Sequence, residues 1–313
     1  MKFVLFVAKW LGLVAIVRWI FTLVDVVVTR LLIRSSKLQD YHREGEACWA
    51  LVTGSSDGIG YGFAQELLSR GFNVLLHGRN GMKLLSCSKD LQSQYPHRQI
   101  QYVVSDSSRS DGSYLLVARR AESLPGKLTV LINNIGGQTL TPQFAPHWSL
   151  PHTDIDATMN MNMRFAAHLT KALFPLLRHS HLGISLNCGS TGGLLGVPYL
   201  ATYTASKAFV HTFTEALKTE LLAEKVNNVE TMGFVIGNTD SNTNKEKIPF
   251  LTVTSRECAK ACLDRIGCGR TLVVPHWKHM LQVWIGDCMP EAMKRKVMGD
   301  EMRARMERER KIG

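Results

Sequence analysis

The stretch that most constrains the fold of this chain is residues 48–60, CWALVTGSSDGIG, where a short apolar run passes through glycines into a helical pattern. The run at 48–53 predicts a buried strand, and the pattern after Gly60 predicts a helix. Gly54 permits a tight turn between them, while Gly58 and Gly60 would let a backbone approach a pyrophosphate at the helix N-terminus. The stretch therefore predicts a phosphate-binding turn, against the alternative of a glycine turn that holds no ligand.

Further apolar runs of strand length follow along the chain, and helical patterns separate them; they lie at 73–77, 101–106, 128–134, 183–188 and 229–236. Alternation of this kind predicts an α/β fold with a doubly wound parallel sheet, a Rossmann fold, over residues 48–275. Ligands of such sheets gather outside the carboxyl ends of the strands. The predicted strand ends carry Gly54, Arg79, Asp106 and Asn134, so we expect these residues to border one site.

Residues 1–34 are predicted to form a hydrophobic membrane anchor, joined to the sheet by a polar linker at 35–47. The segment 3–33 is largely apolar and long enough to cross a bilayer, although Lys9, Arg18 and Asp25 interrupt it. A helix lying in the membrane interface and a buried soluble helix are the alternatives. Basic residues after the segment outnumber the single Lys2 before it, which predicts that the body of the protein faces the cytosol.

The overall charge indicates which partners the protein could bind, and the cysteine content indicates its redox compartment. The net charge of +11 would suit nucleic acid, an anionic membrane or an anionic ligand. No basic stripe interleaved with aromatic residues occurs, so we expect no nucleic-acid partner. The seven cysteines form no CxxC pair and no cluster with zinc spacing, which predicts a reducing compartment and no metal site. Residues 276–313 are predicted to be an amphipathic, basic extension.

The residue that follows the second predicted strand bears on the cofactor. A NAD-binding protein usually presents an acid there to the ribose hydroxyl, whereas this chain has Arg79. A guanidinium suits a 2′-phosphate through charge-assisted, forked hydrogen bonds. The sequence therefore favours NADP(H), against the alternative that Arg79 is only an exposed loop charge. Asp106, at the end of the third strand, is placed to accept a hydrogen bond from an adenine.

Candidate catalytic residues lie further along the chain. Tyr203 and Lys207 are one turn apart on a helix predicted over 201–225, so an ammonium can sit beside a phenol and favour the phenolate. Ser190, at the end of a strand one loop earlier, could converge on the same ligand atom. Asn160 and Asn162 lie within a helix predicted over 154–178, where a polar amide is either a satisfied core group or part of the site.

Together these motifs resemble those of the short-chain dehydrogenase/reductase family: Thr53-Gly54-xxx-Gly58-x-Gly60, Asn133-Asn134-x-Gly136, Ser190 and Tyr203-xxx-Lys207. In that family the tyrosine is the acid–base group, the lysine supports it and holds the nicotinamide ribose, and the serine orients the carbonyl. An asparagine completes a proton relay, and Asn162 matches it better than Asn160. The resemblance implies contacts to NADP(H) from Gly54, Ser56, Asp57, Gly58, Ile59, Gly60, Arg79, Asp106, Asn134, Tyr203, Lys207 and Thr239.

The anchor, Arg79 and the tail make the chain similar, more narrowly, to microsomal 3-oxoacyl-CoA reductases and the related 17β-hydroxysteroid dehydrogenases. The resemblance implies NADPH-dependent reduction of a carbonyl on a lipophilic small molecule, with a 3-oxoacyl-CoA as the leading candidate. A steroid or another lipophilic ketone is the first alternative, and a catalytically silent membrane-associated scaffold is the second. The ending Arg310-Lys311 is similar to dibasic retrieval signals, which predicts the endoplasmic reticulum membrane. Members of the family often form homo-oligomers.

Overall fold

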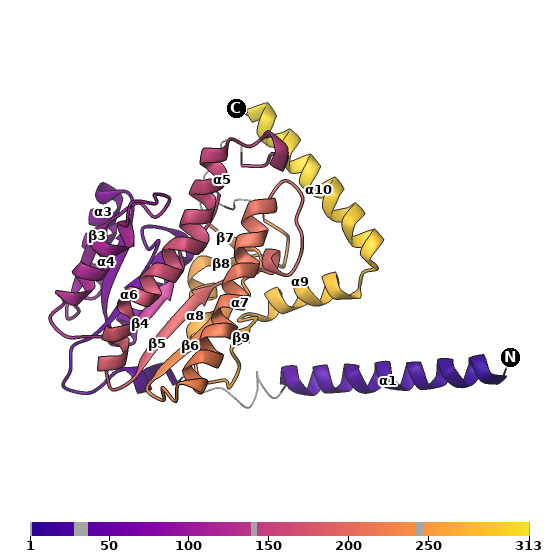
Figure 1. The fold of residues 1–313 in the computed structure, drawn as a ribbon, viewed down its shortest axis with the longest axis horizontal. Helices are drawn as coiled ribbons and strands as arrows, with labels where there is room; N and C mark the ends of the chain where they lie inside the picture. Colours follow the sequence, from indigo (N-terminus) through magenta and orange to yellow (C-terminus); the bar gives the residue numbers. More distant parts are fainter. Residues whose placement is uncertain (1, 28–36, 139–142, 242–243, 245–246, 313) are drawn as a thin grey trace.

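A seven-stranded parallel sheet forms the centre of the computed structural model, which describes residues 2–27, 37–138, 143–241, 244 and 247–312 (Figure 1). Its strands, in spatial order, are β3 (Ile100–Val104), β2 (Asn73–Gly78), β1 (Cys48–Val52), β4 (Lys127–Asn133), β5 (Gly183–Cys188), β6 (Val229–Phe234) and β9 (Leu272–Val273). The direction of winding reverses between β1 and β4, and this switch point is where such sheets bind ligands. The predicted Rossmann-type fold is confirmed.

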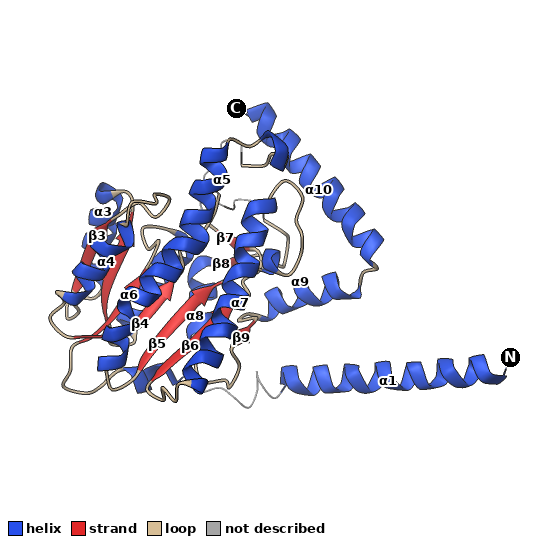
Figure 2. Ribbon diagram, viewed as in Figure 1, coloured by secondary structure: helices blue, strands red, loops and turns tan. Residues whose placement is uncertain are grey.

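Helices cover both faces of the sheet (Figure 2), and the side chains of β1 show why. Cys48, Ala50 and Val52 belong to one apolar core, with α2 (Gly58–Ser69), α3 (Gly81–Gln94) and α8 (Ser255–Leu263). Trp49 and Leu51 belong to the other, with α4 (Ser113–Glu122), α6 (Phe165–His179) and α7 (Ala201–Ala223). Successive side chains of a strand point to opposite faces, so a continuous apolar run is what a strand buried on both faces requires.

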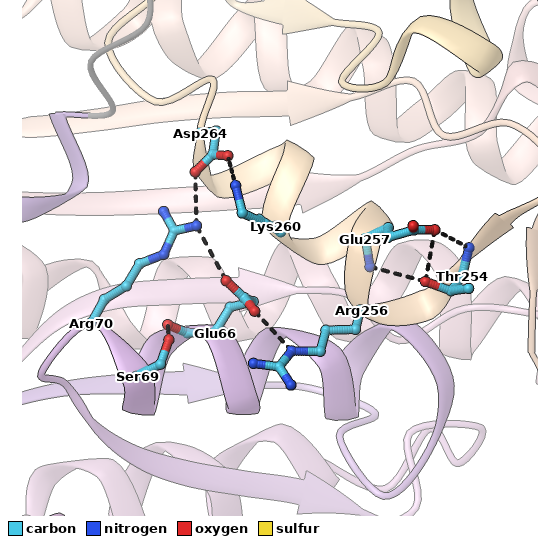
Figure 3. A network of polar contacts seen from close by, with 8 residues as sticks. All are labelled: Glu66, Ser69, Arg70, Thr254, Arg256, Glu257, Lys260 and Asp264. Carbon is cyan, nitrogen blue, oxygen red and sulfur yellow. Dashed lines mark hydrogen bonds and ion pairs between the residues drawn. The ribbon is translucent and has the colours of Figure 1, made fainter.

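Helices α2 and α8 pack closely, and a polar network joins their outer edges (Figure 3). The Glu66 carboxylate, on a side chain that is 9% exposed, lies 2.9 Å from Arg256 Nε and 3.3 Å from Arg70 Nη2. Arg70 Nη2 also lies 2.7 Å from Asp264 Oδ1. A Cβ on Gly62 would lie 2.9 Å from the Ser255 carbonyl oxygen, which explains the small residue at this crossing. The network fixes α2, whose N-terminus follows the glycine turn.

The helix predicted over 154–178 is interrupted in the structure. It consists of α5 (His152–Met159), one π-helical turn (Asn160–Arg164) and α6. A π turn adds a residue to the helical repeat and so changes the direction of the side chains around it; such turns occur frequently at functional sites. Periodicity alone gave no sign of the interruption, because a single extra residue hardly alters the apolar pattern.

The C-terminal extension forms two helices, α9 (Trp277–Cys288) and α10 (Glu291–Ile312), and the C-terminal end of α10 lies near α5 (Figure 1). Met302 and Met306 on α10 are buried. The Glu309 carboxylate accepts hydrogen bonds from the backbone N–H groups of Gln143 (2.5 Å) and Phe144 (3.1 Å). These contacts hold the second half of α10 in place.

The N-terminal segment forms α1 (Lys2–Val27). Many of its apolar side chains are exposed, and Trp19 packs edge-on against Trp284 of α9, with ring centroids 5.4 Å apart. Among the residues that the structure describes, no helix meets the length and apolarity that crossing a membrane would require. The predicted membrane-spanning helix is therefore not supported here.

Candidate active site

The glycine turn lies between β1 and α2, as predicted. Gly54 and Gly58 have backbone φ angles of 65° and 54°, in the left-handed region that glycine enters without strain. A Cβ on Gly60 would lie 2.8 Å from the Gly54 carbonyl carbon, so the turn and the helix approach more closely than a side chain permits. Asp57 caps α2 by accepting a 2.7 Å hydrogen bond from the Gly58 N–H. The N-terminus of α2 would suit a pyrophosphate. A separate cavity of about 640 Å³ opens between α2 and the start of α8, lined by residues that include Asp57, Asp240 and Arg256.

Asn134 fastens the turn to the end of β4. Its Nδ2 donates to the carbonyl oxygens of Thr53 (3.0 Å) and Gly54 (3.3 Å), and its backbone N–H donates to Thr53 Oγ1 (2.9 Å). The side-chain amide nitrogen of Asn134 therefore hydrogen-bonds to the glycine turn. Of the other predicted turn residues, Ser56 lies next to Gly78 at the end of β2, and Ile59 packs against the apolar core.

Arg79 and Asp106 lie near each other at the neighbouring strand ends. Arg79 is exposed immediately after β2. Asp106 Oδ1 accepts hydrogen bonds from Ser108 N (3.0 Å) and Ser108 Oγ (2.7 Å). Burial alone would raise the pKa of Asp106, but the Ser108 hydrogen bonds and the charge of Arg79 outweigh it and lower that pKa below its usual value. The carboxylate is therefore ionised at neutral pH and available as an acceptor.

Tyr203 and Lys207 lie on the first turns of α7. Lys207 is only 5% exposed, and its Nζ donates a 3.0 Å hydrogen bond to the Cys188 carbonyl oxygen at the end of β5. The same Nζ lies 5.8 Å from the centroid of the Tyr203 ring. The hydrogen bond to Cys188 fixes the ammonium between the strand end and the phenol, as the one-turn spacing predicts.

Ser190 follows β5 in a tight loop that packs against α7. Its Oγ accepts a 3.1 Å hydrogen bond from the Gly192 N–H. A Cβ on Gly192 would lie 3.5 Å from Ser190 Oγ and 3.7 Å from Tyr203 Cε1, so the serine and the tyrosine both border this point. Ser190 and Tyr203 thus lie on the same side of the loop, which is the placement that the predicted convergence on one ligand atom requires.

The buried ring of His211 supports the Ser190 loop from behind. A Cβ on Gly193 would lie 2.8 Å from His211 Cε1, and one on Gly189 would overlap the same ring. Burial, with a smaller effect of the Lys207 charge, lowers the pKa of His211. The imidazole is therefore neutral at pH 7 and acts as a packing surface for the loop.

The two candidate asparagines point in different directions. Asn162 is 1% exposed and exchanges two hydrogen bonds with the backbone of Gly137, at 2.8 and 2.9 Å. A Cβ on Gly136 would lie 3.0 Å from Asn162 Oδ1 and 2.5 Å from Lys207 Nζ, so both groups border Gly136. Asn160 donates instead to the Ser108 carbonyl oxygen, at 3.1 Å. The geometry favours Asn162 as the amide beside Lys207.

Thr239 lies in β7 (Thr239–Asp240), which pairs with β8 (Val253–Thr254). Its side chain is buried, and its Oγ1 lies 3.2 Å from the Gly237 carbonyl oxygen and 3.3 Å from His279 Nε2. Burial lowers the pKa of His279 to about 4. In this structure the Thr239 hydroxyl is turned towards α9.

Taken together, these residues suit a nicotinamide dinucleotide. The glycines at the N-terminus of α2 suit its pyrophosphate, Arg79 and Asp106 lie beyond β2 and β3 on one side of the turn, and Ser190, Tyr203 and Lys207 lie beyond β5 and on α7 on the other side. Such a set defines the nucleotide-dependent oxidoreductase class of Rossmann fold. A family model described as short chain dehydrogenase matches residues 48–250. The chain belongs to the short-chain dehydrogenase/reductase family, an oxidoreductase family acting on CH–OH groups, and the predicted resemblance is confirmed.

Several curated relatives are named very-long-chain 3-oxoacyl-CoA reductase. The chain is 28% identical to that of Podospora anserina over 88% of this chain and 81% of the relative. It is 30% identical to that of Aspergillus terreus over 88% of this chain and 77% of the relative. The narrower predicted resemblance to these reductases is therefore confirmed as well.

Solved structures share the fold at lower identity. One, described as giving insights into 7beta-hydroxysteroid dehydrogenase stereoselectivity, has a TM-score of 0.71 at 20% identity and covers 82% of this chain and 98% of its own. A short-chain dehydrogenase from Sphingobium yanoikuyae in complex with NADPH has a TM-score of 0.64 at 21% identity and covers 80% and 95%.

Proposed function

We propose that this protein is an NADPH-dependent reductase of a lipophilic carbonyl compound, with a 3-oxoacyl-CoA as the leading substrate. The observation that carries the proposal is the convergence of Ser190 and Tyr203 on one point beside Gly192, with Lys207 behind the tyrosine. The names of the curated relatives support the substrate class.

The chemistry follows from where the hydroxyl groups lie. A bound nicotinamide supplies the hydride. Ser190 and Tyr203 hydrogen-bond the carbonyl oxygen and stabilise the negative charge that develops on it. Tyr203 then gives its proton to the forming alkoxide, as a general acid. Because Lys207 is buried and held by the Cys188 carbonyl, its charge stays next to the phenol and stabilises the phenolate that remains.

Reprotonation of Tyr203 needs a path from solvent. Lys207 Nζ and Asn162 Oδ1 both border Gly136, so water held by Asn162 could pass a proton through Lys207 to Tyr203. Asn162 owes its position to the π turn, which directs its amide to Gly137. In this role Asn162 is a positioning residue for the water, and Asn160 has no part.

The preference for NADP(H) is proposed from Arg79. Its guanidinium is exposed beside Asp106, where the adenosine end of the cofactor would lie. A 2′-phosphate would bind Arg79, while Asp106 would accept a hydrogen bond from the adenine. The glycine turn, with Ser56, Asp57 and Ile59, would hold the pyrophosphate, and Thr239 would contact the nicotinamide end after turning from His279.

Membrane association is proposed for α1. Trp10, Trp19 and other large apolar side chains of this helix are exposed, and Lys9 and Arg18 are exposed between them. Exposed apolar side chains along this helix would contact acyl chains, and the two basic residues would contact anionic headgroups. We propose that the protein is located at the endoplasmic reticulum membrane, with its reductase domain facing the cytosol.

The test is a substrate panel with NADPH. Cofactor binding is measured by NADPH fluorescence, and turnover is followed as NADPH oxidation with 3-oxoacyl-CoAs, steroid ketones and simpler ketones. We expect turnover of the 3-oxoacyl-CoAs and its loss in Tyr203→Phe. Turnover of steroid ketones alone would replace the proposed substrate class. Cofactor binding without turnover of any compound, or an active Tyr203→Phe variant, would refute the proposed reaction.

A further inference from the structure

A second cavity, of about 980 Å³, lies between the loop that follows Ser190 and the first half of α10. One wall is apolar and consists of Leu194, Leu195, Val197 and Pro198. Ala201 and Thr204, from the first turn of α7, also line it. Thr204 connects the cavity to the catalytic residues, because a Cβ on Gly192 would lie 3.5 Å from both Thr204 Cγ2 and Ser190 Oγ.

The opposite wall is charged and comes from α10. It carries four basic residues, Lys294, Arg295, Lys296 and Arg303, against the two acids Glu291 and Asp300. Glu291 is already engaged, since its carboxylate lies 2.9 Å from Arg295 Nε and 3.9 Å from Lys294 Nζ. Among the described residues, Lys296 has no ion-pair partner. The wall therefore carries positive charge in excess.

Contacts on both sides of the cavity hold this wall in place. Arg303 Nε lies 3.4 Å from Tyr199 Oη, on the loop side. Tyr199 has a backbone φ of 63°, which is unfavourable for a residue with a side chain and persists only where surrounding contacts enforce it. Further along α10, buried Met302 and Met306 and the Glu309 carboxylate anchor the helix to the body. The basic residues are thus held over a cavity whose opposite wall is the loop that follows Ser190.

We infer that Lys296 and Arg303, with Lys294, bind the phosphate groups of the substrate's head, so that this cavity selects an acyl thioester of a phosphorylated carrier such as coenzyme A. The inference rests on the proposed function and adds the residues that recognise the head group. Ammonium and guanidinium groups that flank a cavity provide several charge-assisted donors to a phosphate. A steroid or a simple ketone carries no phosphate and would gain nothing from them.

An anionic lipid headgroup offers the same phosphate chemistry, but the structure favours a small ligand. The basic residues line a cavity continuous with Thr204 and the Ser190 loop, rather than an open flat surface. If α10 bound a membrane instead, replacing its basic residues would not change the binding of a small ligand in this cavity. The two sources are therefore separable by experiment.

The test compares two substrates with the same 3-oxoacyl chain, one carried on coenzyme A and the other on uncharged N-acetylcysteamine. Lys296→Gln and Arg303→Gln should each raise KM for the coenzyme A thioester about tenfold and leave kcat unchanged. Neither should alter KM for the uncharged thioester. Lys89→Gln and Arg119→Gln, which remove exposed charges from α3 and α4, are the matched controls and should change neither KM. Equal effects on both thioesters, or no effect on either, would overturn the inference.

Calorimetric titration of free coenzyme A separates this inference from the proposed reaction, because it needs no turnover. We expect binding to the full-length protein that weakens about tenfold in each α10 variant. If free coenzyme A does not bind, the inference is overturned even when the protein reduces a 3-oxoacyl substrate. Binding without reduction of any 3-oxoacyl thioester would refute the proposed reaction alone. If the α10 variants lose affinity only for vesicles containing phosphatidylserine, the phosphate site belongs to a membrane, and the inference is wrong.

Discussion

Replacement of Gly192 by alanine tests the candidate site with one methyl group. The new Cβ would lie 3.5 Å from Ser190 Oγ, 3.5 Å from Thr204 Cγ2 and 3.7 Å from Tyr203 Cε1. These are ordinary van der Waals distances, and Gly192 does not have a positive φ, so the fold should accept the change. An accepted glycine-to-alanine change stabilises a protein by about 0.4–1 kcal/mol through the unfolded chain. The methyl would, however, occupy space between the two hydroxyl-bearing residues.

Gly192→Ala is expected to lower the rate of the reaction. Displacing a carbonyl by about 1 Å can cost roughly 100-fold in rate, which corresponds to about 2.7 kcal/mol of transition-state stabilisation. We expect kcat/KM for the 3-oxoacyl-CoA to fall by this order in Gly192→Ala, with the NADPH affinity preserved and the free energy of unfolding raised by about 0.4–1 kcal/mol.

The matched control is Gly286→Ala, on α9, where a Cβ would meet nothing within 4 Å. The assays are NADPH oxidation, NADPH fluorescence titration and denaturant unfolding. Wild-type kcat/KM in Gly192→Ala would refute the assignment of the carbonyl position. Loss of activity together with loss of folding would show that the loop geometry described here is wrong.

Three other predictions concern the cofactor, the α2–α8 network and pH. Arg79→Ala should weaken NADPH binding about tenfold or more while NADH binding hardly changes; equal losses in a fluorescence titration would contradict the NADP(H) assignment. Glu66→Ala should lower the free energy of unfolding by about 2 kcal/mol, because Arg70 and Arg256 lose a nearly buried partner, whereas exposed Glu122→Ala should not. Burial lowers the pKa of His77 from 6.5 to about 4, so His77 contributes full stability above pH 6.5 and loses it as the pH falls towards 4. His77→Leu should flatten the pH dependence of unfolding in that window by about 1 kcal/mol per pH unit.

The sheet and the strand-end residues could be predicted because both follow from local sequence. A strand buried on both faces must be a continuous apolar run, as in Cys48–Val52, and such a run is recognisable without knowledge of its neighbours. Strand ends then fix which polar residues meet, because parallel strands end at the same edge of the sheet. Lys207 could be placed beside Tyr203 for a similar reason, since one helical turn sets their separation.

Other parts of the site depend on contacts between distant segments, for which the sequence carries no periodic signal. His211 supports the Ser190 loop only because Gly189 and Gly193 leave room for its ring, and the one available sign was its position one turn after Lys207. The contact of His279 with Thr239 likewise joins α9 to β7. The π turn at Asn160–Arg164 also escaped prediction, although it decides which asparagine faces Lys207.

The residues proposed for the reaction and those proposed for substrate selection are held in place by two different parts of the fold. Lys207 and Asn162 are almost fully buried and bonded to backbone atoms near the ends of β5 and β4, so their geometry depends on the sheet. The basic wall of the second cavity depends instead on α10, which is attached through two methionines and the carboxylate of Glu309. We therefore expect substitutions in α10 to change substrate affinity while Ser190, Tyr203 and Lys207 keep their positions.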